Sequence, residues 1–206
     1  MLHNVSYAWR RWNLVAGCLL AISALCASSC IAPHVSPYLD YAPQPGFTPS
    51  YAVSVNRSTV VFLRPDDIRA LSALLFDGDK FLTILTELTY FVYQTTPGKH
   101  TFASRVTGRG LSFMDAEIAP GKVYFAAVKY GEGNNAWFEL VPIVPDTQYW
   151  KELPEWLRQS KEVRPNSAGF KWFEARRSAV LAQQETNEGK ARRDTMFEEH
   201  GVERAP

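Results

Sequence analysis

The chain has 206 residues, 46% of them hydrophobic and 13% aromatic. This apolar content is enough for a packed core and excludes a chain that is disordered throughout. The formal net charge is only +1, so the basic excess of a nucleic-acid-binding protein is absent and no nucleic-acid partner is expected.

The N-terminal segment has the composition of an export signal. Arg10 and Arg11 precede the uncharged run LVAGCLLAISALC, which is followed by the small residues ASS and then by Cys30. A basic region, an apolar run and small residues in this order are typical of a secretory signal peptide. The run is shorter than the ~20 apolar residues that span a membrane. We therefore predict a signal peptide over residues 1–29.

The sequence before Cys30 resembles the lipobox of bacterial lipoproteins, in which the cysteine becomes the mature first residue and carries the lipid. Ala27, Ser28 and Ser29 supply small residues, although Ala27 stands where the lipobox usually has leucine. Cys18 also follows small residues, but the apolar run before it is too short. Acylation of Cys30 would account for the one thiol that a mature exported chain would keep. Cleavage after Ser29 without lipidation and retention as an uncleaved anchor are the alternatives.

Residues 30–56 are predicted to form a proline-rich tether. Prolines occur at positions 33, 37, 43, 45 and 49, and each fixes its own φ and disfavours helix at the residue before it. Twenty-five extended residues at about 3.1 Å each would reach roughly 75 Å and would hold a domain off a membrane. Four rings in the segment leave open that part of it lies along the domain: Tyr38, Tyr41, Phe47 and Tyr51.

Residues 57–145 alternate short apolar segments with turn signals. The segments lie at 58–65, 73–85, 88–96, 99–106, 111–118, 122–130 and 136–143, and Asp77-Gly78 divides the second of them into the arms of a hairpin. Pro97-Gly98 and Pro120-Gly121 mark two further turns. Seven to eight short strands separated by turns predict an antiparallel sandwich or barrel.

Four motifs follow one another in this region: VVFLRP at 60–65, DGDK at 77–80, PGKHTF at 97–102 and APGKVYF at 119–125. In this order they resemble the bacterial envelope lipoproteins catalogued as a domain of unknown function, DUF2846. The resemblance covers about residues 57–143. It implies a mainly β fold, an immunoglobulin-like antiparallel β-sandwich of about 7–8 strands, carried on a lipoprotein. The family has no assigned catalytic residues to transfer.

Residues 146–206 predict a helical and charged C-terminal extension. Pro154 is expected to break its first part, Asn166-Ser167 to cap a helix over about 168–189, and the charged residues 190–206 to fray. Trp172, Ala175, Ala179 and Ala182 share one helical face, with Phe173 and Val180 beside it. This stripe could pack on the sandwich or contact a partner. The candidate partner-binding residues are Trp150, Trp156, Trp172 and Phe173.

Motifs for nucleotide or metal chemistry fail at required positions. Gly98-Lys99 resembles the end of a phosphate-binding loop, but Tyr93 stands where the first glycine is required and His100 where Ser or Thr is required. The four histidines lack a His or Cys neighbour at ligand spacing. We expect His100 on a sandwich face, hydrogen-bonded to a strand end, and turn chemistry for the aspartates at 66–67 and 77–79. No nucleotide, metal or cofactor is predicted.

These observations predict a non-catalytic binding or structural module of the bacterial cell envelope. A lipid on Cys30 would anchor it, at the outer membrane facing the periplasm, and an envelope protein would be contacted through the C-terminal extension. An exposed apolar patch on the extension would favour this interpretation. The alternative is an envelope hydrolase or glycan-acting enzyme, which a cleft with two convergent carboxylates would favour.

Overall fold

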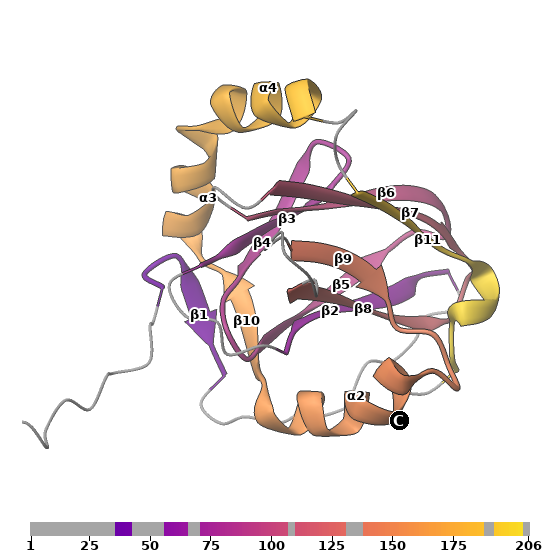
Figure 1. Cartoon of the computed structure of the whole chain (residues 1–206). Coiled ribbons are helices and arrows are strands. Elements are labelled where there is room, and N and C mark those ends of the chain that lie inside the picture. Colours follow the sequence, from indigo (N-terminus) through magenta and orange to yellow (C-terminus); the bar gives the residue numbers. More distant parts are fainter. Residues whose placement is uncertain are drawn as a thin grey trace, which may run out of the picture. The chain divides into compact units, whose positions relative to one another are not determined.

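The computed structural model describes residues 36–42, 56–65, 71–106, 110–130, 138–187 and 192–203. Cys30, the predicted signal peptide and most of the predicted tether lie outside these residues. Figure 1 shows strands stacked as two sheets, with helices after the last strand of the predicted sandwich. The β-sandwich with a C-terminal helical part is thus confirmed.

Eight of the described strands follow the segments that the sequence predicts, with bounds that differ by one or two residues. They are β2 (Ser58–Arg64), β3 (Ala73–Asp77), β4 (Lys80–Leu85), β5 (Thr89–Thr95), β6 (Gly98–Val106), β7 (Gly110–Ile118), β8 (Val123–Tyr130) and β9 (Phe138–Pro142). The hairpin between β3 and β4 is also confirmed, and Gly78 takes a positive φ of 57° as the first of its two turn residues.

The first sheet has the order β1-β10-β5-β2-β8-β9 and the second the order β11-β7-β6-β3-β4. Three neighbouring pairs are parallel, namely β10 with β5, β2 with β8, and β11 with β7. Both sheets are therefore mixed, whereas the sequence patterns predicted antiparallel pairing alone. Each parallel pair joins strands that are far apart in the sequence, which leaves room for the long connection that parallel strands need.

The two Pro-Gly-Lys turns carry the chain from one sheet to the other. The turn at Pro97-Gly98 leads from β5 in the first sheet to β6 in the second, and the turn at Pro120-Gly121 leads from β7 back to β8. Gly98 has a φ of 123° and Gly121 a φ of 72°, values that favour glycine. The repeated motif therefore marks one architectural event that occurs twice.

Apolar residues pack on both faces of the first sheet. Between the sheets, Phe62 of β2 meets Phe102 of β6 edge to face, with ring centroids 5.0 Å apart. On the other face of the first sheet lies helix α2 (Gln148–Gln159), whose Leu153 and Leu157 join a cluster with Val61 of β2. Because both faces are covered, every residue of β2 is buried, as its continuous apolar run suggests.

Helix α2 continues through Pro154, so the predicted break is wrong. Pro154 is exposed, and it removes only one backbone donor from the helix. Leu153 and Leu157 lie one turn apart on the same face and are both buried. At roughly 1.5–3 kcal/mol for each buried leucine, this packing offsets the cost of about 3 kcal/mol for proline inside a helix.

The predicted second helix is present as two helices, α3 (Ser167–Glu174) and α4 (Arg177–Asn187). Asn166 caps α3 as predicted, and its side-chain oxygen accepts a hydrogen bond from the backbone N–H of Gly169 at 3.0 Å. The buried residues differ from the predicted stripe. Phe173 and Val180 face the core, whereas the three alanines of that stripe are exposed: Ala175, Ala179 and Ala182.

The charged tail forms regular structure, so the prediction that it frays is wrong. Strand β11 (Arg192–Met196) pairs with β7 at the edge of the second sheet, and the short 3-10 helix η3 (Glu198–His200) follows. Beyond η3, Val202 forms a bridge with Val123 at the start of β8, with two backbone hydrogen bonds of 2.8 Å. The tail therefore links the second sheet to the first.

Two further strands come from segments that the sequence did not predict as β structure. Strand β1 (Leu39–Tyr41) lies in the segment predicted as a tether, and it pairs with β10 (Lys161–Pro165) from the C-terminal extension. Part of the tether segment therefore lies along the domain, as its rings had left open. The extension is built into the first sheet, where β10 lies between β1 and β5.

Candidate functional site

A polar cluster around His100 joins the ends of several strands. His100 lies near the start of β6, and its Nδ1 is 2.9 and 3.1 Å from the two carboxylate oxygens of Asp77 at the end of β3. Its Nε2 is 2.9 Å from the carbonyl oxygen of Thr96, just beyond β5. The expectation that His100 bonds to a strand end is confirmed.

The same carboxylate connects the two sheets. Tyr93 of β5 donates its hydroxyl hydrogen to Asp77 at 3.0 Å. Lys80 of β4 lies 3.2 Å from the Tyr93 hydroxyl, with its ammonium group 5.0 Å from the Tyr93 ring centroid. We call His100, Asp77, Tyr93 and Lys80 the inter-sheet clasp, because it holds a hairpin of the second sheet to β5 of the first.

Both ring nitrogens of His100 have an acceptor as their nearest partner. An imidazolium ion donates from both nitrogens, so this arrangement favours the charged form. The hydrogen bond to Asp77 raises the pKa of His100, against a smaller opposing effect of burial. A general base needs an imidazole nitrogen that is free to take a proton. The arrangement therefore suits a structural contact better than proton transfer.

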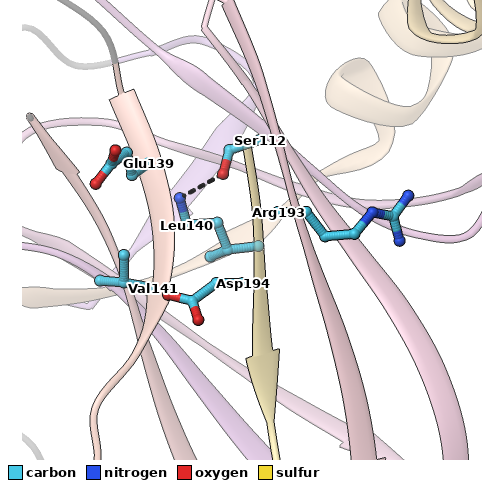
Figure 2. Close-up of a pocket in the computed structure, with 6 residues that line it drawn as sticks. All are labelled: Ser112, Glu139, Leu140, Val141, Arg193 and Asp194. Atoms are coloured by element: carbon cyan, nitrogen blue, oxygen red, sulfur yellow. Dashed lines mark hydrogen bonds between the residues drawn. The ribbon is translucent and has the colours of Figure 1, made fainter. Parts of the chain in front are cut away.

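A groove of about 320 Å³ lies where the edge strands β9 and β11 come near each other (Figure 2). The Oγ of Ser112 on β7 accepts a hydrogen bond from the backbone N–H of Leu140 at 3.0 Å, which ties β9 to the second sheet. Glu139 and Asp194 also line the groove, but in Figure 2 their carboxylates do not point toward one another. Arg193 projects away from both and binds Asp115 at 2.6 and 2.7 Å.

The four aromatic residues predicted to bind a partner lie on two different helices that pack on different sheets. Trp150 and Trp156 are half-buried on α2, and Trp150 contacts Phe125 of the first sheet with centroids 6.0 Å apart. Trp172 is half-buried on α3, and its ring is tilted against that of Tyr38 with centroids 5.5 Å apart. Phe173 is only 1% exposed, so in this structure its ring belongs to the core.

Trp156 of α2 belongs to a small aromatic surface that already holds a cation. The Trp156 and Tyr149 ring centroids are 5.9 Å apart. The ammonium group of Lys129 on β8 lies 3.7 Å from the Tyr149 centroid and 5.1 Å from that of Trp156. All three side chains are partly exposed. This arrangement can present rings to a partner while the cation fixes their orientation.

Two fully buried residues make contacts within the fold that the sequence did not predict. Arg64, at the end of β2, is 0% exposed, and its guanidinium donates to the carbonyl of Leu71 and lies 5.1 Å from the Phe138 ring centroid. Tyr124 of β8 is also 0% exposed, and the tail passes over its ring at Gly201. Arg64-Pro65 directly after an apolar segment marked Arg64 as a residue at a strand end. No local pattern indicated that Tyr124 is buried under the tail.

The remaining predictions concern metal and membrane segments. Within the described ranges, no group of three or more His, Cys, Asp or Glu side chains could hold a metal ion. Among those same residues, none of the helices has both the length and the apolar character needed to cross a membrane. Asp79 lies in the turn between β3 and β4, 3.5 Å from Arg177. The aspartates at 66–67 lie outside the described residues.

Comparison with known proteins adds no relative. No family model matches the chain, and neither a curated protein nor a solved structure matches it.

Proposed function

We propose that this chain is a non-catalytic module of the bacterial cell envelope, anchored by a lipid on Cys30, which binds an envelope partner or has a structural role there. Export, acylation and a position at the outer membrane facing the periplasm are supported by the N-terminal sequence. The motif order that resembles DUF2846 supports the same class of protein. The observation that carries the non-catalytic part is the geometry of His100, whose two ring nitrogens are held by Asp77 and by Thr96.

The aromatic surface on α2 is the proposed contact for a protein partner. Tyr149 and Trp156 pack at the edge of the cluster, stay partly exposed and contact Lys129, whereas Leu153 and Leu157 on the same helix are buried and anchor α2 to the first sheet. Partly exposed Tyr and Trp rings are typical of protein contacts, because they bring large contact area with few rotatable bonds. The alternative, an envelope hydrolase, would use the groove between β9 and β11 with Glu139 and Asp194.

The anchor is tested by fractionation of cells that express Cys30→Ala. The variant should be released from membranes by a salt wash, and Cys18→Ala, the matched control, should remain bound. Retention of Cys30→Ala on washed membranes would contradict lipid anchoring.

The partner surface is tested by crosslinking in intact envelopes, followed by recovery of the protein. Deletion of residues 146–206 is unsuitable, because it would remove β10 and β11 from the two sheets. Trp156→Ala with Tyr149→Ala should instead remove crosslinked partners and leave the fold intact, and Phe197→Ala, on an exposed ring outside α2, is the control. An unchanged set of partners would move the contact away from α2. Hydrolysis of envelope glycan that depends on Glu139 and Asp194 would favour the enzyme.

A further inference from the structure

Strand β1 attaches the chain to the domain only a few residues after Cys30, the predicted lipid site. Asp40 and its neighbours pair with β10, the backbone N–H of Asn166 donates to the carbonyl of Tyr38 at 3.1 Å, and the Asn166 side chain donates to the carbonyl of Pro37 at 3.2 Å. Ser36 is 5% exposed, and its backbone N–H donates to the hydroxyl of Tyr41 at 3.1 Å. The chain is therefore held to the domain from residue 36 onward.

This attachment limits how far the domain can lie from the anchor. Five residues lie between Cys30 and Ser36. The six steps along an extended chain span at most about 3.3–3.6 Å each, or roughly 20 Å in total. The 75 Å expected for a tether of 25 free residues is therefore not available between Cys30 and β1. If Cys30 carries the lipid, the surface around β1 must stay close to the membrane.

The surface beside β1 has the chemistry of a membrane interface. Helix α3 lies next to β1 (Figure 1), and the ring of Trp172 packs near that of Tyr38 with centroids 5.5 Å apart. Phe170 on the same helix is 45% exposed. Trp and Tyr concentrate at membrane–water boundaries, because one end of each ring is apolar and the other is polar.

The charges on and beside this surface balance, with three cations and three carboxylates: Lys171, Arg176, Arg177, Asp40, Asp79 and Glu174. Glu174 and Asp79 both pair with Arg177, at 3.5 Å. Lys171 is exposed, and Arg176 lies over the Trp172 ring at 5.1 Å. Within the part of the chain that the structure describes, Lys171 and Arg176 form no ion pair with a carboxylate. They are thus placed to meet the anionic phosphates of lipid headgroups.

We propose that the α3–β1 face, made of Tyr38, Phe170, Lys171, Trp172 and Arg176, docks on the lipid headgroups of the membrane that holds the anchor. This inference rests on the proposed function, because it takes Cys30 as the lipid site. A short lipid-linked segment would keep the face at the bilayer, and headgroup contacts would fix the orientation of the sandwich. The aromatic surface of α2, which packs on the first sheet, would then be free for a protein partner.

The test places a fluorophore on the face of the full lipidated protein. Of the chain's cysteines, Cys18 and Cys26 precede Cys30 and leave with the signal peptide, so Phe170→Cys introduces the one free thiol. The labelled protein is reconstituted in vesicles of phosphatidylethanolamine and phosphatidylglycerol that contain a nitroxide-labelled lipid. We expect quenching at position 170 to exceed quenching at Phe197→Cys at least threefold. Ala175→Cys, another exposed position beside the face, is a second reporter.

Charge reversal on the face should remove this difference. With Lys171→Glu and Arg176→Glu together, quenching at position 170 should fall to the level at position 197. Reversal of two exposed lysines elsewhere, Lys99→Glu and Lys151→Glu, should leave it unchanged. Replacement of phosphatidylglycerol by phosphatidylcholine should also reduce it.

The outcomes separate this inference from the proposed function. Protein that does not float with vesicles would show that the lipid anchor is wrong, and the docking inference would fail with it. Protein that floats but shows equal quenching at positions 170 and 197 would overturn only the docking inference. A fluorophore that is shielded from water without quenching by lipid would show that protein covers the face, which also overturns docking on lipid.

Discussion

His100 and Asp77 form a contact between a ring nitrogen and a carboxylate at 2.9 Å, although they are 23 positions apart in the sequence. The contact is partly shielded from water, with 12% and 14% of the two side chains exposed. It closes one end of the sandwich, because Asp77 ends β3, His100 lies near the start of β6, and Tyr93 adds a hydroxyl from β5 of the other sheet. The charge of this clasp depends on pH.

The inter-sheet clasp should stabilise the fold more in acid than in base. The pKa of His100 is raised in the folded state above its usual value of 6.5, chiefly by the hydrogen bond to Asp77. A raised folded-state pKa contributes stability that is complete below the unfolded-state pKa and is lost as pH rises through the folded-state pKa. We therefore expect His100→Gln to destabilise the protein more at pH 5.5 than at pH 8.5, as measured by urea unfolding.

Other charges around His100 must be separated from this effect. A groove of about 280 Å³ beside it is also lined by Lys99, Asp115 and Glu117. Lys99→Gln is a matched control, because it removes a neighbouring charge and leaves both bonds of the ring. Its destabilisation should not change between the two pH values. An equal loss of stability for His100→Gln at pH 5.5 and pH 8.5 would show that the ring is neutral in the fold.

Gly169→Ala should destabilise the attachment of β1, against the intrinsic preference of a helix for alanine. Alanine in place of glycine normally stabilises a helix by roughly 0.5–1 kcal/mol. At Gly169, however, a Cβ would lie 2.5 Å from the carbonyl oxygen of Tyr38, which is backbone and cannot rotate away. We expect a net loss of about 1–3 kcal/mol, the usual cost of overpacking.

Urea unfolding measures this loss, and limited proteolysis shows where it acts. Cleavage near residues 36–42 should become faster in Gly169→Ala, while cleavage elsewhere changes less. Ser167→Ala, at an exposed position of the same helix, is the control. A Gly169→Ala protein more stable than wild type would show that β1 does not lie against α3 in solution.

The sequence predicts the strands that carry a complete local signal. β2 to β9 combine apolar or aromatic segments with turn residues, and each was located from these features. The sequences of β1, β10 and β11 are LDY, KEVRP and RRDTM, which are short, polar or interrupted by proline. They are strands because a neighbouring strand offers backbone partners, and such tertiary pairing overrides local preference.

The features of the candidate site also divide into those that the local sequence predicts and those that depend on the topology. The sequence predicts that His100 bonds to a strand end, because a turn precedes it and a strand follows. Asp77 as its partner depends on which turns meet at one end of the sandwich, and this is a property of the topology. Phe173 shows a similar limit, since a helical pattern predicts two sides of α3 but not which one meets Phe76 and Phe81.

Tyr124→Phe should loosen the attachment of the C-terminal tail. The Tyr124 hydroxyl accepts from the backbone N–H of Ala119 at 2.9 Å and donates to the carbonyl of Glu198 at 3.2 Å. Removing it leaves both groups without this partner in a part-buried place, at a cost of roughly 1–3 kcal/mol. Hydrogen exchange at the Ala119 amide should accelerate along with the fall in stability. Tyr130→Phe, at a ring that is 37% exposed, should change neither quantity.

Phe173→Ala should destabilise the protein far more than Phe170→Ala, although both residues lie on α3. The Phe173 ring stacks on Phe81 with centroids 4.6 Å apart and is 1% exposed. Its truncation leaves a cavity and should cost about 3–5 kcal/mol. Phe170 is 45% exposed and meets Phe81 only edge to face at 6.0 Å, so its truncation should cost no more than roughly 1 kcal/mol.

Urea unfolding of the two variants in detergent measures this difference. Phe170→Ala should unfold at nearly the same urea concentration as wild type, whereas Phe173→Ala should unfold at a much lower one. Comparable destabilisation by the two substitutions would mean that α3 is not seated on Phe76 and Phe81 as described. The exposed ring would then have a structural role, and the case for docking through the α3–β1 face would be lost.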